Sequence, residues 1–194
     1  MAAIGSVCVY CGSSVGASPR YREVARAFGR ELAAHRIRLV YGGGGVGLMR
    51  ELADATMAAG GQAIGVIPEL LQKREKGHRG ITELVVVASM HERKNLMFEL
   101  SDAFVVLPGG FGTLDEAFEM MTWRQLGMHD KPILFLNLDG YWDPLDRLVD
   151  HFIGEGFVAE SGRRLFGMVP RVEDIVPALR REPSAPVATP VERL

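Results

Sequence analysis

Short apolar segments alternate with longer segments of helical periodicity along most of the chain. Continuous apolar runs bounded by glycine, proline or polar residues predict buried strands. These runs lie at 6–10, 38–41, 62–67, 84–88, 103–107 and 132–136. Apolar residues spaced by three or four positions predict amphipathic helices between the runs. The helices are expected at 19–34, 48–59, 89–100, 113–126, 144–154 and 172–181.

The alternation of strands with helices predicts an α/β fold, a Rossmann-like doubly wound parallel sheet with helices on both faces. A chain of 194 residues, of which 47% are hydrophobic, can bury a sizeable core without dividing. We therefore expect a single domain over residues 1–181. Residues 182–194 are rich in proline, alanine and valine without a period, and are expected to form a mobile tail.

The charge pattern limits the partners. The net charge is −2, the isoelectric point is near 6.2, and no basic run or alternation of basic and aromatic residues occurs. A nucleic-acid polymer or an anionic membrane is therefore not expected as a partner. No signal-peptide pattern and no apolar run of membrane-spanning length is present, which favours a cytoplasmic location.

The most informative stretch, Pro-Gly-Gly-Phe-Gly-Thr-Leu-Asp-Glu at 108–116, joins a predicted strand to a predicted helix. Gly109, Gly110 and Gly112 let the backbone approach a ligand, and the first helical amides suit a phosphate. Thr113 and Glu116 have the spacing of a capping box, which gives Glu116 a purely structural alternative. Asp115 and Glu116 cannot both face a phosphate, so at least one of them is expected to point past it, toward a sugar or a water, where a carboxylate can act in catalysis. Spacing alone leaves cap and catalyst open.

A second glycine loop follows the second predicted strand. Gly42, Gly44 and Gly47 match the dinucleotide pattern G-x-G-x-x-G, but only Glu69 could bind a ribose, and Pro68 precedes it. A dehydrogenase is therefore a weak alternative, and no G-K-[ST] follows either loop, which excludes a Walker-type NTPase. The polar stretch 68–80 is either a solvated connection or a lid.

One predicted helix carries an arginine in its apolar stripe. Met90, Arg93, Met97 and Leu100 fall on one helical face. A buried guanidinium requires an anionic partner, although Arg93 could also extend to solvent from the first turn. The order of the elements would place Arg93 close to Glu116.

Cys8 and Cys11 have C-x-x-C spacing, but the pair lies at the end of a predicted strand instead of opening a helix. Buried thiols are therefore favoured over a redox pair. Two cysteines without matching histidines do not make a zinc site, and His91-Glu92 lacks the second histidine of H-E-x-x-H. No metal is expected. Because the glycine loops and Arg93 all follow strands, a phosphate-bearing small molecule such as a mononucleotide is the predicted ligand.

The chain resembles the LOG (Lonely Guy) family over nearly its whole length up to about residue 181. The resemblance rests on four motifs: C-G-S-S at 11–14, Y-G-G-G at 41–44 with G-L-M at 47–49, M-H-E-R-K at 90–94, and P-G-G-x-G-T-x-x-E at 108–116. It implies hydrolysis of the N-glycosidic bond of N6-substituted adenosine 5′-monophosphates, such as the N6-isopentenyl form, or of AMP itself, to a free base and ribose 5-phosphate. It also implies that no cofactor is needed, and it suggests a homodimer with the site near the subunit interface.

The resemblance assigns catalysis to Arg93 and Glu116. The residues expected to bind substrate are Gly12, Ser13, Gly43, Gly44, Glu75, Lys94, Gly109, Gly110, Phe111, Gly112, Thr113, Leu114, Asp115 and Thr122. Arg50 stands where the family often has glycine.

Two other readings are weighed against the hydrolase. Family members are often labelled lysine decarboxylases, but none of the four lysines (Lys73, Lys76, Lys94 and Lys131) lies in an evident pyridoxal-phosphate site. The second reading is a non-catalytic module of the same fold that binds a nucleotide or a molybdenum cofactor.

Overall fold

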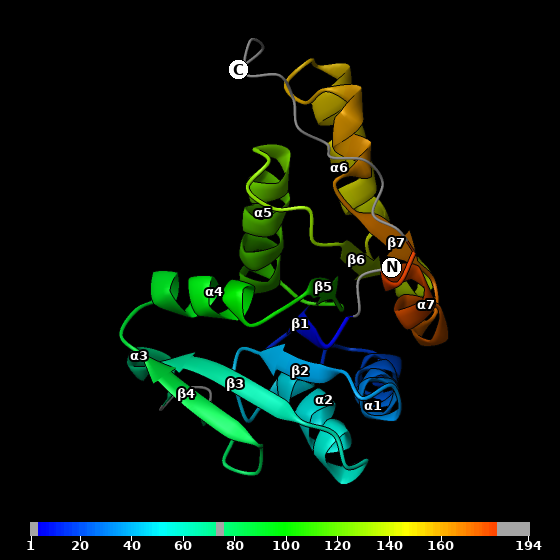
Figure 1. The fold of residues 1–194 in the computed structure, drawn as a ribbon. Coiled ribbons are helices and arrows are strands. Elements are labelled where there is room, and N and C mark those ends of the chain that lie inside the picture. The colour runs from blue at the N-terminus through cyan, green and yellow to red at the C-terminus, as the bar shows by residue number, and fades with distance from the viewer. Residues whose placement is uncertain (1–3, 73–75, 182–194) are drawn as a thin grey trace.

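The computed structural model describes residues 4–72 and 76–181 (Figure 1). Its centre is a seven-stranded sheet in which every neighbouring pair is parallel. The strands are β1 (Ser6–Tyr10), β2 (Arg38–Tyr41), β3 (Ala63–Pro68), β4 (Glu83–Val87), β5 (Ala103–Val106), β6 (Ile133–Leu136) and β7 (Gly167–Val169). Their order across the sheet is β4-β3-β2-β1-β5-β6-β7. The predicted doubly wound parallel sheet is confirmed.

The α-helices of the described residues connect these strands. They are α1 (Pro19–Ala34), α2 (Gly47–Ala58), α3 (Glu69–Gln72), α4 (Met90–Glu99), α5 (Phe111–Gln125), α6 (Asp143–Gly154) and α7 (Ile175–Leu179). Short 3₁₀ turns lie at Leu138–Gly140, Glu160–Arg164 and Val172–Asp174. Ser18 caps α1 and Pro19 opens it, because a proline at the first helical position loses no hydrogen bond.

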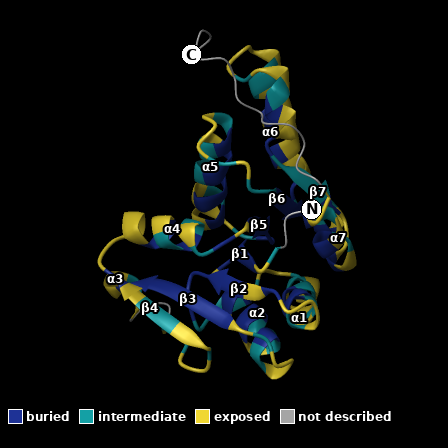
Figure 2. Cartoon of the chain, in the orientation of Figure 1, coloured by how far each residue is buried: buried dark blue, intermediate teal, exposed yellow. Residues whose placement is uncertain are grey.

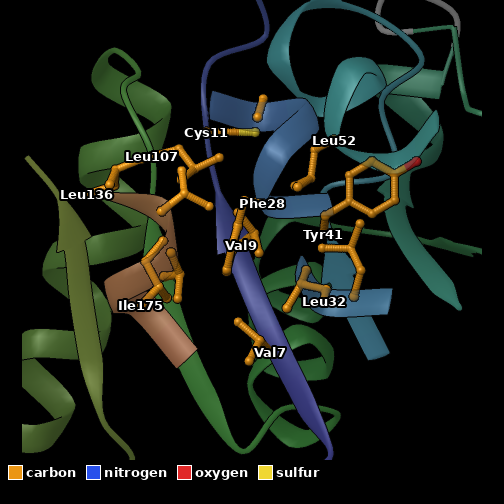
Figure 3. Packing of buried hydrophobic residues seen from close by; sticks show 14 of the residues in the cluster. Val7, Val9, Cys11, Phe28, Leu32, Tyr41, Leu52, Leu107, Leu136 and Ile175 are labelled. Atoms are coloured by element: carbon orange, nitrogen blue, oxygen red, sulfur yellow. The ribbon is translucent and has the colours of Figure 1, made fainter. Parts of the chain in front are cut away.

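The sheet has a core on each face. Strand residues of one parity, such as Val7 and Val9, pack with α1, α2 and α7 (Figure 3), and those of the other parity, such as Cys8 and Tyr10, pack with α4, α5 and α6. Figure 2 shows β1, β3 and β5 buried along their whole length, whereas the edge strand β4 is partly exposed. Both faces are therefore covered, as a parallel sheet requires.

All the predicted strands, and all the predicted helices but one, are confirmed to within two residues. The exception is the helix expected at 172–181, which is divided into a 3₁₀ turn and α7. The short strand β7 and the one-turn helix α3 were not predicted. The expected tail at 182–194 lies outside the described residues.

The thiols of Cys8 and Cys11 are both buried, as predicted, and no disulfide joins them. They belong to the cores on opposite faces of the sheet, so the C-x-x-C spacing does not pair them. Burial raises the pKa of the Cys8 thiol, which keeps it protonated. Among the described residues there is no cluster of histidine, cysteine and carboxylate side chains suited to a metal ion. None of the described helices has the length and apolar character needed to span a bilayer.

Candidate active site

A cavity of about 440 Å³ lies where the chain leaves the carboxyl ends of β1, β2 and β5. β1 lies between β2 and β5, and the chain order reverses there, which is the usual binding crevice of such sheets. The lining residues are Val9, Cys11, Gly12, Ser13, Ser14, Gly16, Tyr21, Gly42, Leu48, Met49, Leu71, Met90, Arg93, Pro108, Gly109, Gly110, Phe111, Gly112, Thr113, Glu116 and Tyr141.

Backbone hydrogen bonds join the three loops that form the floor of the cavity. The Gly12 amide donates to the Pro108 carbonyl at 3.1 Å, and the Leu48 amide donates to the Gly12 carbonyl at 3.0 Å. Gly47 has φ +62°, and a Cβ there would lie 2.2 Å from the carbonyl carbon of Ser13. Close backbone contact explains why this loop requires glycine. The loops therefore form one unit instead of three independent turns.

The helix α5 begins earlier than its capping-box spacing indicates. Its N-cap is Gly110, no side chain caps it, and Thr113 lies within the first turn with 3% exposure. The capping-box alternative for Thr113 and Glu116 is therefore wrong, since a residue inside the helix cannot be its N-cap. Glu116 lies in the second turn, is 8% exposed and lines the cavity.

Two glycines at the start of α5 leave room for a ligand. A Cβ built on Gly110 or Gly112 would meet no atom within 4 Å, whereas one on Gly109 would lie 2.1 Å from Thr113 Oγ1. Packing therefore requires glycine at 109 but not at 110 or 112. The amides that open a helix lack partners within it and attract anions, so this N-terminus suits a phosphate.

Arg93 is held inside the protein by backbone carbonyls. Its Nε donates to the Val66 carbonyl and one terminal nitrogen donates to the Gly42 carbonyl, both at 3.1 Å. The other terminal nitrogen, Nη1, lies 3.8 Å from Glu116 Oε1. With 5% of its surface exposed, Arg93 does not extend to solvent, and the predicted proximity to Glu116 is confirmed.

The position of Arg93 depends on two local features. Ser89 Oγ accepts the Glu92 amide and the Glu92 carboxylate accepts the Ala88 amide, which fixes the start of α4 one turn before Arg93. A Cβ on Gly42 would lie 1.8 Å from an Arg93 terminal nitrogen, so glycine is needed for the guanidinium to enter.

The two adjacent carboxylates of α5, Asp115 and Glu116, point to different surroundings. Asp115 is exposed and lies 3.4 Å from Lys94 Nζ, which also contacts Glu119 at 3.2 Å. Burial alone would lower the Lys94 pKa, but Glu119 and Asp115 together outweigh it and raise that pKa above its ordinary value. Asp115 is thus neutralised outside the cavity, and Glu116 is the carboxylate that faces in.

The structure brings nine of the predicted site residues together around the cavity: Gly12, Ser13, Arg93, Gly109, Gly110, Phe111, Gly112, Thr113 and Glu116. The other described ones, Gly43, Gly44, Lys94, Leu114, Asp115 and Thr122, are not among its lining residues. Glu75 lies outside the described residues.

Two of the predicted site residues that do not line the cavity have contacts elsewhere in the fold. Gly43 has φ +70° and packs against β3, where a Cβ would lie 3.2 Å from Ile67 Cβ. Thr122 is exposed on α5 and donates to the Phe118 carbonyl. Arg50, the departure from the family pattern, is exposed and pairs with Asp54.

Sequence reasoning missed the aromatic wall of the cavity. Tyr21 is part of the apolar stripe of α1, and Tyr141 reads as a packing residue, yet both line the cavity. Their rings meet edge to face with centroids 5.5 Å apart. The two tyrosines are 120 positions apart in the chain, so no local spacing could have paired them.

Comparison with known proteins places the chain in a family. A family model described as "possible lysine decarboxylase" matches residues 49–179. The probable cytokinin riboside 5′-monophosphate phosphoribohydrolase LOGL9 of Oryza sativa subsp. japonica is 49% identical over 88% of this chain and 75% of its own length. The enzyme LOG7 of Arabidopsis thaliana is 46% identical over 88% of this chain and 78% of its own. The chain belongs to the LOG family.

Comparison with solved structures supports the fold, at lower sequence identity than the relatives above. The molybdenum cofactor carrier protein of Chlamydomonas reinhardtii aligns with a TM-score of 0.68 and 19% identity, covering 91% of this chain and 96% of the carrier. The molybdenum cofactor binding protein of Rippkaea orientalis aligns with a TM-score of 0.69 and 20% identity, covering 90% of this chain and 94% of that protein. This likeness establishes a shared architecture only. Of the lysines within the described residues, Lys76, Lys94 and Lys131, none lines the cavity.

Proposed function

We propose that this protein hydrolyses the N-glycosidic bond of adenosine 5′-monophosphates, including N6-substituted ones, and releases the free base and ribose 5-phosphate. The observation that carries the proposal is the contact between Arg93 and Glu116 inside the cavity, beside the open N-terminus of α5. The relatives named as cytokinin riboside 5′-monophosphate phosphoribohydrolases support the same chemistry.

Glu116 is suited to the bond-breaking step. Departure of the base leaves positive charge on the ribose, and a carboxylate beside the anomeric carbon stabilises that charge. The same carboxylate can orient or deprotonate the attacking water. In this proposal one water adds to the anomeric carbon, and the bonding electrons and a proton leave with the base.

Arg93 and the glycine loop take the supporting roles. Two nitrogens of the guanidinium donate to backbone carbonyls, which fixes Nη1 toward Glu116 and toward a ligand in the cavity. The amides of Gly110, Phe111 and Gly112 would bind the 5′-phosphate and supply binding energy used for orientation.

The competing reading is a carrier that binds a nucleotide or molybdenum cofactor without reacting. A carrier needs the anion cradle but has no use for a buried arginine–glutamate pair directed into the same cavity. That pair favours the hydrolase. Neither Arg93 nor Glu116 is needed to bury apolar surface, and holding both costs desolvation energy.

The protein is further proposed to act as a homodimer with its site near the interface, and its cytoplasmic location stays a prediction. Phe111, at the cavity edge, is 95% exposed. Thr122, a substrate contact by family resemblance, lies on α5 outside the cavity of its own chain. A second copy packed on α5 would cover Phe111 and could bring Thr122 to the neighbouring site.

The deciding experiment is incubation of the purified protein with AMP and with N6-isopentenyl-AMP, followed by chromatography for free base and ribose 5-phosphate. Equal amounts of both products from at least one nucleotide are expected. Tight nucleotide binding without either product would favour the carrier instead. Adenosine, which lacks the phosphate, serves as the matched poor substrate.

A further inference from the structure

The side-chain hydroxyl of Tyr141 contacts the glycine loop that precedes α5. This hydroxyl donates to the Gly109 carbonyl at 2.7 Å, across 32 positions of sequence. Tyr141 follows the 3₁₀ turn after β6, whereas Gly109 precedes α5, so the bond joins two neighbouring loops at the cavity. The resemblance to the LOG family gave this tyrosine no role.

The peptide that Tyr141 contacts lies between two glycines. It joins Gly109 to Gly110, and two glycines allow the peptide plane to turn over without steric penalty from a side chain. In a trans peptide the carbonyl and the following amide point in opposite directions. One orientation can therefore offer the Gly110 amide to an anion, while the inverted one would offer the Gly109 carbonyl and repel it.

The hydroxyl of Tyr141 is itself held in place from several sides. Its ring meets Tyr21 edge to face at 5.5 Å and Trp142 edge to face at 4.8 Å. Asn137 accepts the Trp142 amide and donates to Asp143, which fixes the turn that carries the ring. A donor with so little freedom can select one of the two orientations that a peptide between glycines can adopt.

We infer that Tyr141 is a positioning residue, which locks the Gly109–Gly110 peptide in the orientation that receives the anionic phosphate of the substrate. This inference rests on the proposed function for the identity of the substrate, but the phosphate-binding step stands apart from hydrolysis. Tyr141 acts through the backbone of Gly109 and transfers no proton to substrate.

The test compares wild type with Tyr141→Phe, which keeps the ring and removes only the hydroxyl. Affinity for ribose 5-phosphate should fall about three- to tenfold, the effect of losing one neutral hydrogen bond, while affinity for adenine stays unchanged. The KM for AMP should rise by a similar factor with kcat less affected. Calorimetry gives the two affinities, and a thermal melt checks folding.

A purely structural role would weaken both ligands together or lower the melting temperature alone, and either result would overturn the inference. Failure of the wild type to bind ribose 5-phosphate would also overturn it. If ribose 5-phosphate binds in a Tyr141-dependent way but no nucleotide is cleaved, the proposed function fails and the positioning role stands.

A second measurement needs no variant. Titration of ¹⁵N-labelled wild type with ribose 5-phosphate should shift the Gly110 amide resonance, whereas adenine should leave it in place. An unmoved Gly110 resonance at saturating ribose 5-phosphate would contradict the inference even if Tyr141→Phe failed to fold.

Discussion

At the scale of single residues, Asp115 and Glu116 show how position on a helix decides chemistry. They are adjacent in sequence, yet Asp115 is exposed and pairs with Lys94, whereas Glu116 is buried beside Arg93. Sequence alone could say that the two carboxylates diverge. Helical spacing could not say which one faces inward, because that depends on where α5 begins, and no capping side chain marks its start. The expectation that Glu116 meets Arg93 came instead from the order of the elements and from the family resemblance.

Removing the charge of Glu116 tests its assignment. Glu116→Gln keeps the size of the side chain, so AMP should bind nearly as in the wild type, while base release slows at least about a hundredfold. Single-turnover assays give the rate, and calorimetry gives the affinity. Glu119→Gln makes the same change one turn later, outside the cavity lining; its rate should stay close to that of the wild type. Unchanged turnover by Glu116→Gln would remove it from the mechanism.

The glycines at the start of α5 make a second residue-scale prediction. Gly112→Ala should leave the melting temperature unchanged or raise it, because alanine stabilises a helix by up to about 1 kcal/mol over glycine. The added methyl enters space that no protein atom fills. Affinity for ribose 5-phosphate should therefore fall although the protein is no less stable.

Gly109→Ala is the matched comparison, because its methyl would collide with Thr113. This variant should lose stability, as shown by a lower melting temperature. If Gly112→Ala instead bound ribose 5-phosphate as tightly as wild type, the open space at Gly112 would not be where the anion lies.

At the scale of elements, hydrophobic pattern predicted the sheet well because buried parallel strands are continuous apolar runs. β7 was not predicted because it begins with Gly167 and has only three residues, a length too short to show any periodicity. The site was predicted in part: Arg93 stood out as a charge in an apolar stripe, and its meeting with Glu116 followed from strand order. Tyr141 did not stand out, because an aromatic residue beside a turn is ordinary packing.

The segment after α5 carries a prediction about pH. The ring of His129 is bonded through Nε2 to the Met120 carbonyl, and its buried Nδ1 has no hydrogen-bond partner among the residues that the structure describes. Burial lowers its pKa below the ordinary value of 6.5. The unfolded chain therefore takes up this proton at higher pH than the folded chain does, so the His129 contribution is complete above about pH 6.5 and is lost as pH falls below it.

Thermal melts between pH 7.5 and 5.5 measure this effect. His129→Gln keeps a donor for the Met120 carbonyl but cannot be protonated, so its melting temperature should fall less on acidification than that of the wild type. His151→Gln, at an exposed position of α6, should follow the wild-type curve. Parallel curves for wild type and His129→Gln would refute the assignment.

At the scale of the whole molecule, the outer face of α5 remains to be explained. Residues 111, 115, 118 and 122 share one side of an α-helix, and in this chain they include the exposed Phe111 and the partly exposed Phe118. Two aromatic rings on one exposed stripe are unfavourable in water and typical of an interface. The stripe begins at Phe111, which lines the cavity, so a second copy packed there would lie close to both cavities.

Phe118→Asp tests this surface without altering a cavity-lining residue. A carboxylate on each side of a symmetric interface repels its own copy, so sedimentation velocity should show the wild type as a dimer and the variant as a monomer. Phe157→Asp, at a ring that is 84% exposed after α6, is the matched control and should remain dimeric. A monomeric wild type would overturn the proposed dimer, and a Phe118→Asp protein that stays dimeric would place the interface elsewhere. Lost dimerisation with unchanged nucleotide cleavage would show that each cavity works without the second copy.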